Sequence, residues 1–93
     1  MKQIQKFISR KFINEILLIP EGHTAQNFNG MITLSDVGNF IWNNVEKVSN
    51  LNELIKLIVD TYDVETNEAL QDAITFLTQL LNLGMLKPET SEW

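Results

Sequence analysis

The spacing of apolar residues changes once along this chain, at Ser35. From Met31 to Leu34 apolar and β-branched residues follow one another, and such residues suit a pleated, half-buried strand. After Ser35 the apolar residues recur at helical spacing, and the serine side chain can accept a hydrogen bond from the first free N–H groups of that helix. The sequence therefore predicts a strand that becomes a helix within two residues, so that a strand edge lies beside an apolar helical layer.

Two extended segments precede this junction and are predicted to form a β-hairpin. Residues 6–12 and 15–20 are rich in apolar and β-branched residues, and Asn14 between them tolerates the left-handed backbone that a tight turn needs. After a polar loop at residues 20–23, residues 28–34 are predicted as a third strand. The alternation of side chains along a strand places one set on the same face: Phe28, Ile32 and Leu34.

Three helices are predicted in the second half of the chain. Apolar residues recur at helical spacing in residues 36–46, 51–62 and 67–83. Gly84 then ends the third helix, because glycine favours the backbone conformation found just past helix ends. The fold class is therefore α+β, with a three-stranded antiparallel sheet followed by three helices.

The third predicted helix has more apolar surface than one core-facing stripe needs. Two stripes run side by side at helical spacing. The first consists of Leu70, Ile74, Leu77 and Leu81, and the second of Ala69, Ala73, Phe76 and Leu80. A helix that is apolar all round is usually buried between neighbours. The alternative is that one stripe faces the core and the other lines a groove, and the pattern leaves both open.

Composition favours one globular domain and argues against a nucleic-acid partner. The 93 residues are 44% hydrophobic, which suits a single domain over residues 1–93 with a flexible tail at residues 87–93, where Trp93 is expected to be mobile. Twelve acidic and seven basic residues give a net charge of −5, which opposes binding to phosphate backbones. Cysteine is absent, and no apolar run suits a signal peptide or a membrane span. We therefore expect a cytoplasmic protein that binds neither nucleic acid nor membrane.

No cluster of residues predicts catalysis or metal binding. His23 is the single histidine, and in a loop without Cys partners it is expected to be solvated. Asp60 and Asp63 are expected to cap a helix end or face water, and Ser35 is expected to be a helix cap and not a nucleophile. We therefore expect no enzyme activity, no metal and no cofactor.

The order of the elements and the residues between them resemble the PqqD family, small peptide-binding modules also known as RiPP recognition elements. The resemblance covers nearly the whole chain. The helix that contains Gly38, Ile41 and Trp42 resembles that of the broad PqqD-like group more closely than that of members that serve pyrroloquinoline quinone synthesis. The residues that carry the resemblance are Leu17, Leu18, Ile19, Pro20, Phe28, Asn29, Gly30, Leu34, Ser35, Gly38, Ile41, Trp42, Leu54, Tyr62, Asp63, Asp72, Phe76, Leu77, Leu80, Gly84, Met85 and Leu86.

What the resemblance implies is a winged-helix-like peptide chaperone of natural product biosynthesis. It would bind the leader segment of a ribosomally synthesised precursor peptide as an added strand and present it to a modifying enzyme, without performing chemistry. Strand addition of this kind takes affinity from main-chain hydrogen bonds and selectivity from side-chain pockets. On this chain the pairing edge would be Asn29, Gly30, Met31, Ile32, Thr33 and Leu34. The apolar wall would be Ala69, Ala73, Phe76 and Leu80, with Asp72 and Gln79 at its border.

Several partners and two other classes of function stay open at this point. The modifying enzyme would be a radical SAM enzyme, a cyclase or a leader protease, and an uncovered third strand also allows a homodimer through its edge. The other classes are a winged-helix DNA-binding or transcription-associated protein and a structural subunit of a larger complex. The DNA-binding class needs basic groups on its recognition helix, and residues 67–84 carry no Lys or Arg.

Overall fold

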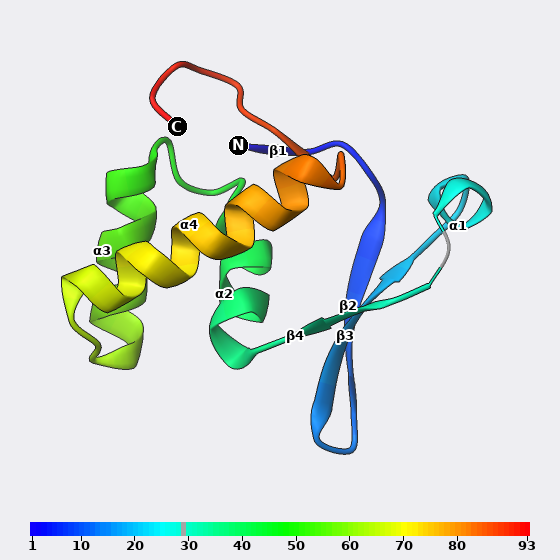
Figure 1. Ribbon diagram of the computed structural model, residues 1–93, viewed down its shortest axis with the longest axis horizontal. Helices are drawn as coiled ribbons and strands as arrows, with labels where there is room; N and C mark the ends of the chain where they lie inside the picture. The colour runs from blue at the N-terminus through cyan, green and yellow to red at the C-terminus, as the bar shows by residue number, and fades with distance from the viewer. Residues whose placement is uncertain (29) are drawn as a thin grey trace.

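The computed structural model describes residues 1–28 and 30–93 and contains the predicted three-stranded antiparallel sheet (Figure 1). Strands β2 (Phe7–Phe12) and β3 (Glu15–Pro20) form the hairpin, and β4 (Ile32–Leu34) pairs with β3. These residues form strands because they are rich in apolar and β-branched side chains, which suit a pleated, half-buried segment.

Strands β2 and β4 form the two edges of this sheet, and the edge at β4 is open. The register places Leu34 opposite Ile16 and Ile32 opposite Leu18. Among the described residues, β4 pairs with no strand on its other side. Leu34 is buried and Ile32 packs partly buried against the core, whereas Thr33 between them is exposed. Within the part of the chain that the structure describes, backbone groups on the outer side of β4 therefore have no strand partner.

Three long helices follow the sheet. Their bounds are α2 (Asp36–Asn44), α3 (Leu51–Tyr62) and α4 (Thr66–Asn82), and each end lies within two residues of the predicted one. Figure 1 shows α2 between α3 and the sheet, and α4 packs across both other helices. No helix formed by the described residues is long and apolar enough to cross a membrane.

One core joins the sheet to the helices. The ring of Phe7 on β2 meets the ring of Trp42 on α2 edge to face, with 6.2 Å between centroids. The rings of Phe28 and Phe7 also meet edge to face, with 5.0 Å between centroids. The largest fully buried side chains are Leu18, Ile41, Val45, Leu54, Ile58, Leu80 and Met85.

Two short features that the sequence did not predict complete the fold. Strand β1 (Lys2–Gln3) pairs with β5 (Leu86–Lys87), so the two ends of the chain lie close together (Figure 1). Helix α1 (Thr24–Asn27) is a single turn within the loop before β4. Thr24 is buried there, and its Oγ1 accepts a hydrogen bond of 2.9 Å from the Lys6 N–H. Strands of two residues and a helix of one turn are too short for an apolar period to show.

The third strand is shorter than predicted. It begins at Ile32 and not at residue 28. Gly30 has a φ of 99°, which no regular strand contains and which glycine adopts without a steric cost. Asn29, also inside the predicted range, lies outside the described residues. The open edge therefore consists of three residues, Ile32–Leu34.

The hairpin turn and the end of the chain also differ from expectation. Ile13, and not Asn14, adopts the left-handed backbone in the turn, with a φ of 55°. Trp93 packs partly buried against the core and shares a small pocket with Met1 and Leu51, so it is not the free tail residue that the sequence suggested.

The junction between β4 and α2 forms as predicted. Ser35 is the N-cap of α2, and its Oγ accepts a 3.0 Å hydrogen bond from the Gly38 N–H. Replacing Ser35 by Ala removes this acceptor, so we expect the free energy of unfolding to fall by about 1 kcal/mol. Urea denaturation followed by circular dichroism measures this change. Ser35→Thr keeps a hydroxyl and should lose much less, so equal losses in the two variants would contradict the capping role.

Candidate functional site

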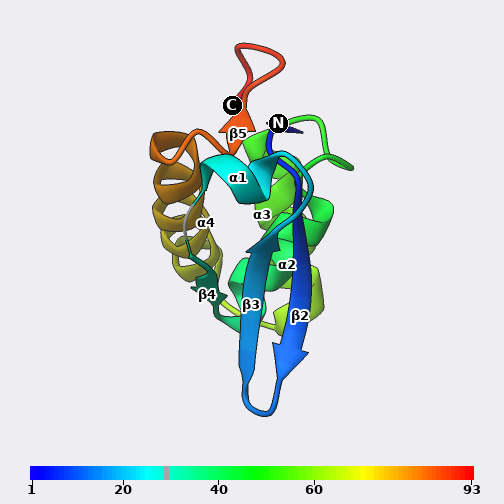
Figure 2. The same ribbon diagram turned by 90° about the vertical axis from the view of Figure 1, so that its right-hand side faces the viewer.

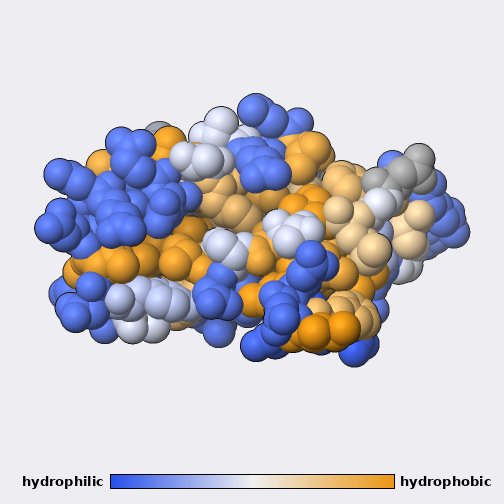
Figure 3. All heavy atoms as spheres, turned by 60° about the horizontal axis from the view of Figure 1, so that its bottom comes forward, coloured by the Kyte–Doolittle hydropathy of each residue, from blue (hydrophilic) through white to orange (hydrophobic). Residues whose placement is uncertain are grey.

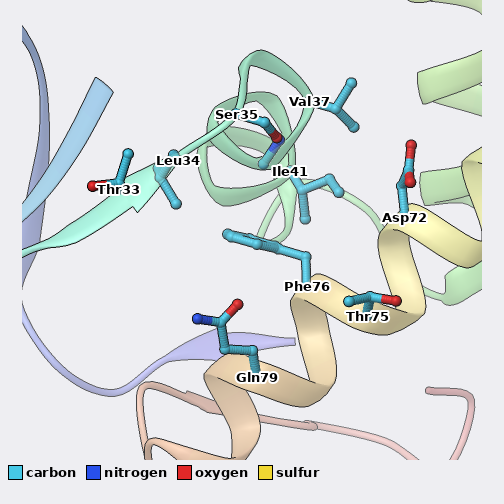
Figure 4. A pocket seen from close by; sticks show the side chains of 10 residues that line it. Thr33, Leu34, Ser35, Val37, Ile41, Asp72, Thr75, Phe76 and Gln79 are labelled. Carbon is cyan, nitrogen blue, oxygen red and sulfur yellow. The ribbon is translucent and has the colours of Figure 1, made fainter. Parts of the chain in front are cut away.

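A groove lies between the open sheet edge and helix α4 (Figure 4). Its volume is about 470 Å³. The end of β4, the first two turns of α2 and the middle of α4 form its walls. The residues that line it are Thr33, Leu34, Ser35, Val37, Gly38, Ile41, Asp72, Thr75, Phe76 and Gln79.

Helix α4 turns one face toward this groove. Asp72, Thr75, Phe76 and Gln79 are spaced three and four residues apart, which places them on one side of a helix. Figure 4 shows the Phe76 ring pointing from α4 toward Leu34 and the start of α2. Phe76 is half-buried and the other three are exposed. This face therefore offers one aromatic anchor among polar side chains.

Phe76 packs closely on α2 because residue 38 is glycine. A Cβ built on Gly38 would lie 3.2 Å from Cε1 of Phe76, closer than ordinary van der Waals contact. Glycine inside a helix costs about 1 kcal/mol relative to alanine, so close packing explains its presence here. Ile41, one turn further along α2, and Leu34 are both buried. The floor of the groove is therefore apolar.

The groove carries little charge. Among the described residues that line it, Asp72 is the single charged one, and helices α2 and α4 contain no Lys or Arg. On the face shown in Figure 3, hydrophobic residues run through the middle and hydrophilic ones gather at the margins. Within residues 1–28 and 30–93, no group of three or more His, Asp or Glu side chains is placed to hold a metal ion. A ligand of this groove would therefore be held by apolar contact and backbone hydrogen bonds more than by charge.

The structure brings some of the predicted site residues together. Gly30 and Met31 are exposed but precede the strand, and Ile32 packs against the core. Asn29 lies outside the described residues. The predicted site residues that line the groove are Thr33, Leu34, Asp72, Phe76 and Gln79.

Three residues of the predicted apolar wall do not line the groove, and this corrects the prediction. Ala69, Ala73 and Leu80 are each 0% exposed and belong to the core. By contrast, Ile74 and Leu81, from the stripe that the prediction left to the core, are 43% and 38% exposed. Helix α4 packs against both α2 and α3. Its most apolar stripe is therefore buried in the core, and the more polar face beside it lines the groove.

Sequence reasoning assigned no ligand-binding role to several lining residues. They are Ser35, Val37, Gly38, Ile41 and Thr75. Two signals were present: a lone glycine inside a helical pattern usually marks close packing, and Thr75 shares a helix face with Asp72 and Gln79. On the α4 face, Asp72, Phe76 and Gln79 were predicted and Thr75 was not, because Thr75 carries no apolar signal.

The fold and the groove together define a class of protein: a small mixed α/β domain whose open sheet edge borders an apolar groove lined by a helix. A family model identifies the family within that class. The family model described as coenzyme PQQ synthesis protein D (PqqD) matches residues 15–86, and the chain belongs to this family. The predicted family membership is thereby confirmed.

A solved structure has the same fold. It is described as TbiB1 in complex with the TbiA(beta) leader peptide, and it matches with a TM-score of 0.68 and 23% sequence identity. The match covers 98% of this chain and 100% of that chain. At this identity the likeness shows a shared fold. No curated protein matches the chain.

Proposed function

We propose that this protein is a non-catalytic adaptor that binds the leader segment of a ribosomally synthesised precursor peptide. The leader adds a strand to the outer edge of β4 and places side chains in the groove. The adaptor then presents the peptide, in the cytoplasm, to a modifying enzyme such as a radical SAM enzyme, a cyclase or a leader protease. It works by raising the local concentration of the peptide at the enzyme.

The observation that carries this proposal is the position of the open edge along the groove. An added strand would lie about 4.8 Å from β4. Thr33 and Leu34 of β4 themselves line the groove. Alternate side chains of the peptide would therefore point toward Phe76 and Ile41. The described structure of TbiB1 with a leader peptide supports this reading, because it is a peptide complex of the same fold.

Because β4 is short, backbone hydrogen bonds contribute less to leader affinity than buried apolar side chains do. Three residues of β4 supply about three backbone hydrogen bonds, each contributing roughly 1 kcal/mol. Two buried apolar anchors contribute about 2 kcal/mol each, and association and ordering oppose these gains. We therefore expect micromolar affinity in which the apolar anchors select the peptide.

Direct titration tests the proposal. The precursor peptide encoded beside this chain, its leader segment alone and its core segment alone are each titrated by calorimetry, with a DNA duplex as the competing ligand. We expect the leader to bind and the core not to bind. Because few charges line the groove, leader affinity should change little between 50 and 200 mM salt, unlike the steep loss of phosphate-driven binding. Binding to the duplex without binding to the leader would refute the proposal.

Strand addition also predicts an alternating effect of backbone methylation. A methyl group on a peptide nitrogen that faces β4 removes one hydrogen bond and blocks close approach, so affinity should fall at least about tenfold. On the next residue the N–H points away from β4, so methylation there should have little effect. A scan of singly N-methylated leader peptides should therefore alternate along the segment that pairs with β4. A flat profile would mean that the peptide does not bind as a strand.

The same edge of β4 would also serve a homodimer. Because one edge accepts one strand, leader binding and pairing with a second copy through β4 exclude each other. Leader addition should therefore convert any such dimer to a monomeric complex in sedimentation experiments.

A further inference from the structure

The tip of the β2–β3 hairpin exposes two large apolar side chains. Phe12 is 50% exposed and Ile13 is 91% exposed. Both ribbon views show this turn projecting beyond the helices, at the end of the molecule away from the chain termini (Figures 1 and 2). Single exposed apolar residues are ordinary on protein surfaces, but adjacent ones on a projecting turn form a compact apolar anchor.

Ile13 is also held in an unfavourable backbone conformation. The turn that joins Phe12 to Glu15 contains two residues, and Ile13 has a φ of 55°. Turns of this length use Gly, Asn or Asp at left-handed positions, and a β-branched residue there is a steric outlier. Isoleucine therefore weakens the turn and exposes apolar surface, and neither effect benefits the isolated chain. Strain that a protein retains at such a site points to a function of the side chain.

The N-terminal part of the chain, which contains the hairpin, differs in charge from the remaining chain. Residues 1–21 contain four basic and two acidic residues, whereas residues 22–93 contain three basic and ten acidic residues. Arg10 and Lys11 lead directly into the tip and are exposed. Glu15, across the turn from Phe12, is also exposed, so two cations and one anion border the tip. An apolar anchor with this net positive border complements an apolar pocket with an acidic rim.

We infer that the hairpin tip docks into an acidic-rimmed apolar pocket on the enzyme that modifies the bound peptide. The identity of this partner rests on the proposed function. Phe12 and Ile13 do not line the peptide groove, and the register of Ile16 with Leu34 places the turn past the end of β4. The adaptor can therefore hold the leader and the enzyme at the same time.

The test uses the purified modifying enzyme encoded beside this chain and measures its affinity for immobilised full-length adaptor. Ile13→Gly should weaken enzyme binding at least about tenfold, because the central apolar anchor is lost. The same substitution relieves the left-handed strain, so the melting temperature should stay equal or rise. Leader affinity should not change. Leu83→Ala, at another exposed apolar residue (44%), is the matched control and should bind the enzyme as wild type does.

Charge reversal gives a second, independent measurement. Arg10→Glu should lower the affinity for the enzyme and reduce the change of that affinity with salt. Lys56 is an exposed cation on α3, and Lys56→Glu should have neither effect. Wild-type affinity in Ile13→Gly, or no binding by the wild type, would overturn the inference. It would also be overturned if the chain alone self-associated through the tip, seen as oligomers that Ile13→Gly abolishes. Failure of the wild type to bind the leader, measured separately, would instead refute the proposed function.

Discussion

Replacing Phe76 by Ala should weaken leader binding roughly 30-fold, which corresponds to about 2 kcal/mol for one lost apolar anchor. The Phe76 ring is half-buried and packs on the glycine of α2, so it is an aromatic surface already fixed before a peptide arrives. A pre-ordered side chain loses little conformational freedom on binding. Calorimetric titration of the folded variant with the leader peptide measures the effect, and circular dichroism confirms that the fold is intact.

The same helix provides the control for this prediction. Ile74 lies two residues earlier, is 43% exposed, and belongs to a separate small pocket with Trp93. Ile74→Ala removes a comparable exposed apolar side chain and should leave leader affinity unchanged. If both variants bind as wild type, the peptide site lies elsewhere, and if both weaken binding equally, the effect comes from the helix and not from the groove.

The regular elements were predictable because each carries a local signal. Short apolar and β-branched segments indicated the hairpin, the period-3.6 pattern indicated the three long helices, and the Ser35 cap fixed the start of α2. The pairing of β1 with β5 was not predictable, because it joins two-residue segments from opposite ends of the chain. The start of β4 was misplaced because the positive φ of Gly30 is a backbone choice that apolar alternation does not report.

The site was only partly predictable because an apolar stripe on a helix can face either the core or a groove, and apolarity alone does not distinguish the two. Leu77 was left to the core and Phe76 to the groove, and the burial of Leu77 and the position of Phe76 agree with this. Ala69, Ala73 and Leu80 are as apolar as Phe76, but they are buried in the core. Burial depends on where α2 and α3 pack, which is tertiary information. The polar groove residue Thr75 carried no apolar signal at all.

Leu80 separates these two assignments by experiment. Its side chain is fully buried, so Leu80→Ala should lower the free energy of unfolding by about 3 kcal/mol through lost burial and a residual cavity. For a domain of this size the melting temperature should fall by about 12–24 °C. Urea denaturation and thermal melting measure both. At a temperature where the variant is still folded, its leader affinity should remain within about twofold of wild type, because Leu80 does not line the groove.

The neighbouring residue should show the reverse pattern. Gln79 is exposed at the border of the groove, so Gln79→Ala should leave stability within about 0.5 kcal/mol of wild type, as surface substitutions usually do. Leader affinity should fall about threefold to tenfold if its amide bonds the peptide, which corresponds to roughly 0.5–1.5 kcal/mol. The pair therefore tests the geometry of α4 itself. A large loss of leader affinity in folded Leu80→Ala, with none in Gln79→Ala, would mean that α4 rotates on binding and that the stripe predicted from sequence forms the wall after all.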